Sequence, residues 1–362
     1  SEATTNFVVG DITVSGGALS NFAATSTTVY TATLTPTASG VAAIVVAGGA
    51  FTDAASNTNT RTSISWVYDG TAPTLSSVSI ASNNSTTTLA KADDVITLTF
   101  TASEVISTPV VTFLSGGAAI TDTSVTYANT PGNTWTAAYI ANASDTSGPV
   151  SFSIAYADTV GNAGTAVTSG SGSVTFDKTA PTMTITAAEV TDGDTSNDTT
   201  LSLTFTSSEA TSDFVKTDIT VVGGSLGDLS GSGTTYTATF TPTASGATTI
   251  DVASSKFTDA AGNNNTAATQ FNWTYDGTAP TLSSVSIASD NSPTTLAMEG
   301  DVVTLTFTAS ETISTPVVTF LSGGTAITDI SVSLMKFSFP NTIGDTWRAS
   351  YTVDASDTSG PV

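Results

Sequence analysis

The sequence predicts an all-β chain built of repeated antiparallel β-sandwiches, and three observations support this class. Short runs alternate apolar residues with Ser or Thr, as in the run from Ile96 to Thr101, which is typical of a strand with one buried face. Turn-forming clusters such as Ser115-Gly116-Gly117 separate these runs. No segment has a sustained 3.6-residue apolar period, so helices are not expected.

Internal repeats define the units. Residues 71–82 recur letter for letter at 278–289, and a connector of the form Asp-x-Thr-Ala-Pro-Thr begins at Asp69, Asp177 and Asp276. The repeats predict units of roughly one hundred residues in two alternating types. We expect a partial unit at 1–69 that lacks its first strands, whole units at 70–177 and 178–276, and a partial unit at 277–362 that lacks its last strands. The chain is therefore expected to be a fragment of a longer array.

Strand spacing within a whole unit indicates the kind of sandwich. About seven short strands per hundred residues, with turns every 8 to 12 residues, are typical of an immunoglobulin-like sandwich. Aromatic residues recur at matching strand positions, and each is followed by an apolar residue two positions later, which predicts burial in the core and not a sugar-stacking platform. These positions are Tyr30, Trp135, Tyr236 and Trp347, together with Trp66 and Trp273 on the last strand of the other type.

The composition excludes most catalytic chemistry. The chain has 30 Asp plus Glu against 7 Lys plus Arg, a net charge of −23, no His and no Cys. It therefore lacks a ready general base near neutral pH, a thiolate nucleophile and the usual zinc ligands. The acidic excess repels nucleic acid and anionic lipid, and no apolar run approaches the roughly 18 residues that a membrane span needs. We predict a protein that is not an enzyme and that has no nucleic-acid partner or membrane insertion in this segment.

Two enzyme-like patterns in the sequence do not change this prediction. The Asp-Thr-Ser-Gly sequences at Asp145 and Asp357 resemble aspartic-protease loops, but an inserted Ser spoils the motif and the two copies lie in different units. The carboxylates of Glu104 and Asp158 could meet the spacing of a glycosidase pair, but the neighbouring turns provide no predicted cleft. Neither pattern predicts an active site.

Acidic residues recur at three classes of position. The second strand of each unit ends in Ser-Glu, the sixth strand ends in Asp followed four residues later by Asn, and the connector carries an Asp. In an antiparallel order the second and sixth strands run back to the pole where the preceding connector enters. These carboxylates are therefore expected to meet at that pole, Glu104 and Asp158 near Asp69, and Glu209 and Asp259 near Asp177.

Oxygen ligands without His or Cys are the ligand set of calcium. We therefore predict Ca²⁺ at the junctions between units, where a bound ion would turn a hinge into a stiff joint. The predicted ligands are Asp69, Glu104, Asp158, Asn162, Asp177, Glu209, Asp259, Asn263, Asp276 and Glu311. The alternative is that Asp and Asn only stabilise turns and that each Glu is a solvated strand end.

The Asp-x-Thr-Ala-Pro connectors, Phe-x-x-Ser-Glu strand ends and Asp-x-x-Gly-Asn loops resemble the bacterial Ig-like repeat domains of large surface adhesins. The resemblance covers the whole chain. It implies extender domains, often stiffened by calcium, that hold a binding module away from the cell. It places this role on Asp69, Glu104, Asp158, Asp177, Glu209, Asp259, Asp276 and Glu311. The loop at 53–57 departs from the pattern, with Ser56 in place of Gly, and no ligand-binding module is present in the chain.

These observations predict a non-enzymatic stalk or filament segment of a repetitive cell-surface or secreted protein. Its expected partners are neighbouring repeats of the same chain and, in a fibre, other copies. Two alternatives remain open: a self-assembling fibre or virion-fibre domain, and a carbohydrate- or receptor-binding adhesin module. Residues 333–340, which replace a shorter segment of the second unit, are expected to form a lengthened turn or a contact hairpin.

Overall fold

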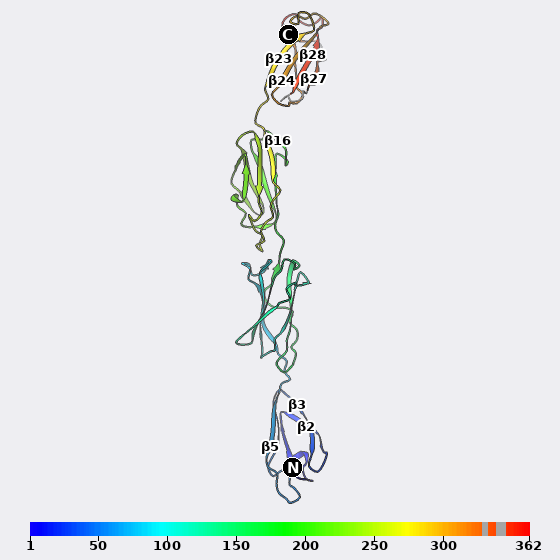
Figure 1. The fold of residues 1–362 in the computed structure, drawn as a ribbon, viewed down its shortest axis with the longest axis vertical. Coiled ribbons are helices and arrows are strands. Elements are labelled where there is room, and N and C mark those ends of the chain that lie inside the picture. Colours follow the sequence, from blue (N-terminus) through cyan, green and yellow to red (C-terminus); the bar gives the residue numbers. More distant parts are fainter. Residues whose placement is uncertain (328–331, 338–344) are drawn as a thin grey trace.

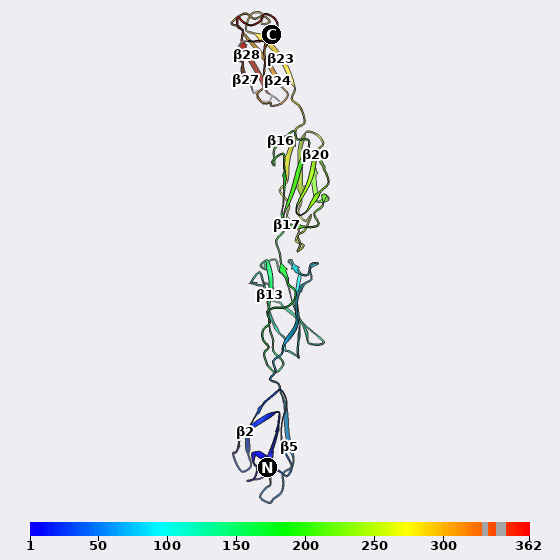
Figure 2. The same cartoon turned by 180° about the vertical axis from the view of Figure 1, so that it is seen from behind.

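The computed structural model describes residues 1–327, 332–337 and 345–362, and its units follow one another end to end (Figure 1). We name them by the repeat boundaries: unit 1 (1–69), unit 2 (70–177), unit 3 (178–276) and unit 4 (277–362). Each sheet takes all its strands from one of these ranges. The view from behind also shows a single stretch of chain joining each unit to the next (Figure 2). The predicted all-β tandem fold is confirmed.

Unit 1 contains two small sheets and one 3-10 turn, η1 (Val9–Asp11). One sheet has the order β1-β4-β5 and the other pairs β2 with β3. Tyr30 is half-buried and lies in a ring cluster with Phe7 and Phe22. The strands are β1 (Ile12–Ser15), β2 (Gly17–Ala24), β3 (Tyr30–Pro36), β4 (Gly40–Val46) and β5 (Thr62–Tyr68).

Unit 2 is a two-sheet sandwich with the orders β11-β12-β8-β6 and β10-β9-β13-β14-β7. The predicted alternation is confirmed, because Ile96, Leu98 and Phe100 are fully buried while the Thr residues that alternate with them are half-buried. The strands are β6 (Leu75–Ser82), β7 (Leu89–Ala90), β8 (Val95–Ala102), β9 (Val110–Ser115), β10 (Ala118–Ala119), β11 (Thr126–Thr130), β12 (Thr134–Ile140), β13 (Gly148–Ala155) and β14 (Thr175–Phe176).

Unit 3 repeats this plan with the orders β15-β17-β20-β19 and β16-β22-β21-β18. Its core contains Phe205, Phe240 and Ile250, which are also fully buried. The elements are β15 (Met183–Ala187), β16 (Thr195–Ser196), β17 (Leu201–Thr211), η2 (Lys216–Asp218), β18 (Ile219–Val222), β19 (Gly224–Leu226), β20 (Ser230–Pro242), β21 (Gly246–Val252) and β22 (Phe271–Tyr275).

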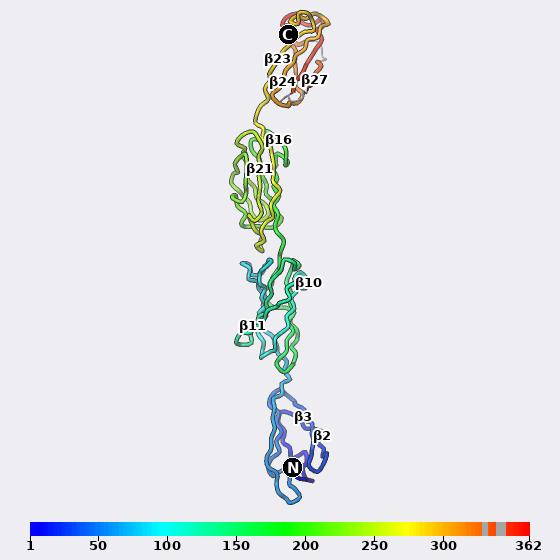
Figure 3. Tube along the Cα trace, viewed as in Figure 1, coloured from blue at the N-terminus to red at the C-terminus, as the bar shows by residue number. Residues whose placement is uncertain are grey.

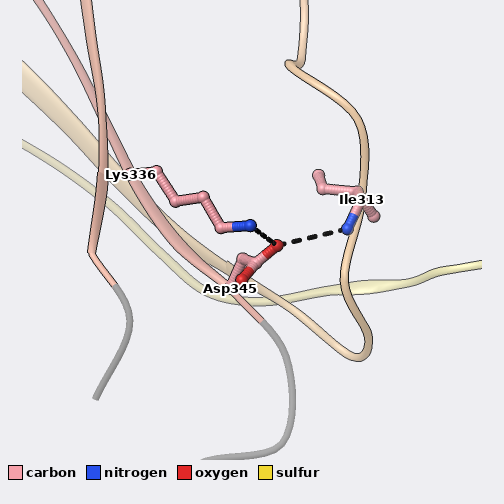
Figure 4. Close-up of polar contacts among 3 residues, drawn as sticks. All are labelled: Ile313, Lys336 and Asp345. Atoms are coloured by element: carbon pink, nitrogen blue, oxygen red, sulfur yellow. Dashed lines mark hydrogen bonds and ion pairs between the residues drawn. The ribbon is translucent and has the colours of Figure 1, made fainter.

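Unit 4 has one sheet in the order β23-β24-β28-β27 and the short pair β25-β26. Residues 333–337 of the predicted turn or hairpin form the edge strand β27, and residues 338–340 lie outside the described residues. Lys336 Nζ lies 2.7 Å from Asp345 Oδ2, which also accepts the Ile313 N–H (Figure 4). The strands are β23 (Leu282–Ser289), β24 (Val302–Ala309), β25 (Leu321–Ser322), β26 (Thr325–Ala326), β27 (Ser333–Phe337) and β28 (Thr346–Thr352).

Burial of the matching aromatic residues is confirmed in units 2, 3 and 4 and is wrong for Trp66. Trp135, Tyr236, Trp347 and Trp273 are at most 8% exposed, whereas Trp66 is 38% exposed. In unit 3, β16 pairs with β22 and Ser196 Oγ accepts the Trp273 Nε1–H at 3.0 Å. Residues 1–69 include no counterpart of β16, so nothing in this range covers the indole of Trp66 as β16 covers that of Trp273.

Across the described ranges, no helix has the length and apolar character needed to cross a membrane.

Candidate metal centre

The structure brings six of the predicted carboxylates into two groups of three. Asp69, Glu104 and Asp158 form one group, and Asp177, Glu209 and Asp259 form the other; in each group one oxygen per residue lies within 4.8 Å of the others. The connector supplies Asp69 or Asp177. The end of β8 or β17 supplies Glu104 or Glu209, and the loop after β13 or β21 supplies Asp158 or Asp259. Strand parity therefore places them at the pole that the connector enters, as predicted. Their role as metal ligands remains a prediction.

The loop that follows β13 is folded around the Asp158 carboxylate. Oδ1 accepts the backbone N–H groups of Val160, Gly161 and Asn162 at 2.9, 2.7 and 2.9 Å. Gly161 has φ +106°, a conformation that favours glycine. The aspartate is 3% exposed, so the short loop holds its carboxylate in place by hydrogen bonds from its own backbone.

The two asparagines predicted as ligands act as hydrogen-bond donors in the structure. Asn162 Nδ2 donates to Asp158 Oδ2 at 2.7 Å and to the backbone carbonyl of Asp69 at 3.0 Å. Asn263 Nδ2 donates to Asp259 Oδ2 at 2.9 Å and to the Asp177 carbonyl at 3.1 Å. Each asparagine therefore ties the connector to the loop and orients the carboxylate, and the same arrangement recurs at both junctions.

The pKa values of acidic residues in both groups reflect their burial, their hydrogen bonds and the charges beside them. Burial, followed by the charges of Asp177 and Asp259, raises the pKa of Glu209. At Asp158, burial acts to raise the pKa, but the side-chain and backbone hydrogen bonds of Asn162 and its neighbours outweigh it and lower the pKa. Within the described residues, the two ion pairs join Lys216 to Asp228 and Lys336 to Asp345, away from both groups. A cation would therefore relieve the repulsion among these acids.

The raised pKa of Glu209 predicts an unusual pH dependence. Its proton is held more tightly in the folded chain than in the unfolded chain, so its contribution to stability is present below the unfolded value near 4.5 and is lost as pH rises through the folded pKa. In metal-free buffer, wild type should therefore gain unfolding temperature relative to Glu209→Gln as pH falls from neutral toward 4.5. Parallel melting curves of the two proteins over this pH range would contradict the prediction.

The other predicted ligands, Asp276 and Glu311, and the equivalent acidic residues of unit 1 lie outside these groups. Asp276 Oδ1 accepts the Thr278 N–H at 3.0 Å, and Glu311 is half-buried; neither belongs to a group of three among the described residues. Residues 277–362 contain no counterpart of the sixth-strand aspartate. In unit 1, Asn57 and then Glu2 contribute hydrogen bonds that lower the pKa of Asp53.

The repeat pattern did not predict the serines that hold the connectors. Ser39 Oγ accepts the Gly70 N–H at 3.0 Å and lies 2.8 Å from Thr71 Oγ1. Ser245 Oγ accepts the Gly277 N–H in the same way at 3.0 Å. The repeated Ala-Ser-Gly at 38–40 and 244–246 was the available signal, but only the folded turn shows that it faces the connector.

The fold and the junction geometry define a tandem Ig-like β-sandwich protein with acidic poles. Residues 1–69 and 177–275 match the family model described as bacterial Ig-like domain. The predicted resemblance to bacterial Ig-like domains is confirmed for these two ranges.

Comparison with solved structures found other tandem Ig proteins. An I9–I11 tandem from titin is 11% identical, with a TM-score of 0.27, over 73% of this chain and 85% of that one. An I67–I69 I-band fragment of titin is 11% identical, with a TM-score of 0.29, over 80% and 91%. Tandem Ig repeats of Dlar are 12% identical, with a TM-score of 0.19, over 57% and 98%. Comparison with curated proteins gave no match.

Proposed function

We propose that the chain is a non-catalytic extender of a cell-surface or secreted protein, with joints stiffened by Ca²⁺. The observation that carries this proposal is that a group of three acidic residues recurs at two successive junctions. Each group is built from the connector and two segments of the unit that the connector enters. A catalytic centre would not need to be repeated at successive junctions, whereas a series of equivalent joints would need the same group at each joint.

The donor set fits calcium. Each group offers three carboxylates and lies beside a connector backbone carbonyl, and Ca²⁺ prefers such hard oxygen ligands in flexible geometry. Thiolate and imidazole ligands, which favour zinc or copper, do not occur in the sequence. Asp69, Glu104 and Asp158 would hold the ion at the first joint, and Asp177, Glu209 and Asp259 at the second.

An ion at these positions would act on the joint itself. Asp69 and Asp177 stand at the ends of connectors, whereas the other ligands belong to the following sandwich. Binding would therefore fix the connector to that sandwich and restrict bending, because relative motion of linked domains is the default when their interface is small. The buried aromatic residues of units 2, 3 and 4 argue against a sugar-stacking platform there.

Small-angle scattering of the whole chain tests this function. We expect a larger maximum dimension with Ca²⁺ than with chelator, and a smaller calcium response in Asp69→Asn and Asp177→Asn. The Asp192→Asn variant is the control, because Asp192 accepts the Asn272 N–H in unit 3 and lies outside both groups. An identical maximum dimension in calcium and in chelator would remove the calcium joint and leave the fold unaffected.

A further inference from the structure

Units 2 and 3 also touch each other directly at the tip of one loop. Asn84, in the loop after β6, donates through Nδ2 to the backbone carbonyl of Ala261 at 2.9 Å. Ala261 lies at the tip of the loop from Asp259 to Asn263, which folds around Asp259. In Figure 3 the lower tip of unit 3 lies next to the loops at the upper end of unit 2.

The burial of the loop tip supports a packed contact. Ala261 is 2% exposed, while Val160, at the matching position of the unit 2 loop, is 66% exposed. The neighbouring Gly262 faces the side chain of Lys91, because a Cβ built on this glycine would lie 3.5 Å from Lys91 Cε. Unit 2 therefore contacts the tip both through an amide and through the aliphatic stem of a lysine.

Unit 2 holds the asparagine in position before the contact is made. Asn84 Nδ2 also donates to Asp94 Oδ2 at 2.7 Å, and the same oxygen accepts the Lys91 N–H at 2.8 Å. Unit 4 repeats this arrangement, because Asn291 Nδ2 donates to Asp301 Oδ2 at 2.8 Å.

We infer that Asn84 is the positioning residue of an interface between neighbouring units, which aligns units 2 and 3 without any cation. Its partner is the backbone of the loop tip at Ala261, so the amide recognises loop shape and not a side chain.

The Asn84 contact does not rest on the proposed calcium joints. Measurements in chelator examine the contact alone, and measurements in Ca²⁺ examine the metal site. Failure of one therefore leaves the other standing.

Distance distributions between spin labels test the contact. The chain has no Cys, so cysteines introduced at the exposed residues Thr112 and Thr239 label units 2 and 3 uniquely. In chelator we expect a narrow distribution for the parent protein. Asn84→Ala should about double its width, because a small interface leaves linked domains free to move. Asn291→Ala is the matched control, since it removes the equivalent bond within unit 4 and should leave the width unchanged.

A second variant guards against local unfolding of unit 2. Ala261→Gln adds bulk at the contact from the side of unit 3, at a position where unit 2 carries the exposed Val160, so unit 3 should tolerate it. We expect the same broadening, with the tryptophan fluorescence of the whole chain unchanged. If both variants keep the parent's narrow distribution in chelator, the inference is overturned.

Discussion

Replacing Trp273 with Ala should destabilise unit 3 by about 3–5 kcal/mol, the usual cost of removing a buried indole. Trp273 is 1% exposed, contacts the rings of Phe240 and Tyr275, and donates its indole N–H to Ser196. The variant loses these contacts and leaves a cavity between the two sheets. Chemical denaturation followed by circular dichroism should show one transition, that of unit 3, shifted to lower denaturant concentration.

Trp66→Ala is the matched control for this prediction. Trp66 occupies the corresponding repeat position in unit 1, but it is 38% exposed and contacts no counterpart of β16. Its loss should therefore cost clearly less, about 1 kcal/mol. Equal losses in the two variants would show that Trp66 is covered in solution as Trp273 is.

Calcium should reverse the effect of the Glu209→Gln substitution on unit 3. In chelator the variant should melt at a higher temperature than wild type at neutral pH, because burial and the neighbouring Asp177 and Asp259 raise the pKa of Glu209 and disfavour its charge. With calcium, wild type should become the more stable protein. An ion at one hundred times its dissociation constant contributes about 2.7 kcal/mol to the folded state.

Differential scanning calorimetry in chelator and in calcium measures both halves of this prediction. Glu189→Gln is the control, because Glu189 is an exposed residue of unit 3 that accepts the Ser202 N–H and lies outside both carboxylate groups. Its calcium response should match that of wild type. An equal calcium shift in wild type and Glu209→Gln would place the ion elsewhere or exclude it.

The alternation of apolar and polar residues and the antiparallel direction of successive strands made much of this structure predictable. The run from Ile96 to Thr101 became β8, and the antiparallel order alone located Glu104 and Asp158 beside Asp69. Both inferences need only the side-chain period of a strand and the direction in which each strand runs.

Contacts that depend on other segments were beyond the sequence. The exposure of Trp66 depends on whether another strand covers its sheet, which its own local pattern does not encode. The amide direction of Asn162 depends on the connector carbonyl beside it. The bond from Asn84 to Ala261 joins residues far apart in sequence across two sandwiches, and no repeat or periodicity signals such a pair.

The parallel pairing near the ends of units 2 and 3 determines how tension would pass through them. In unit 2, β7 near the start pairs in parallel with β14 at the end, and in unit 3, β16 pairs with β22 in the same way. The chain enters a unit at one pole and leaves at the other (Figure 1). A pull on both termini therefore slides each pair along its own axis and loads its hydrogen bonds together in shear. Such a unit resists extension more strongly than a hairpin that is peeled open bond by bond.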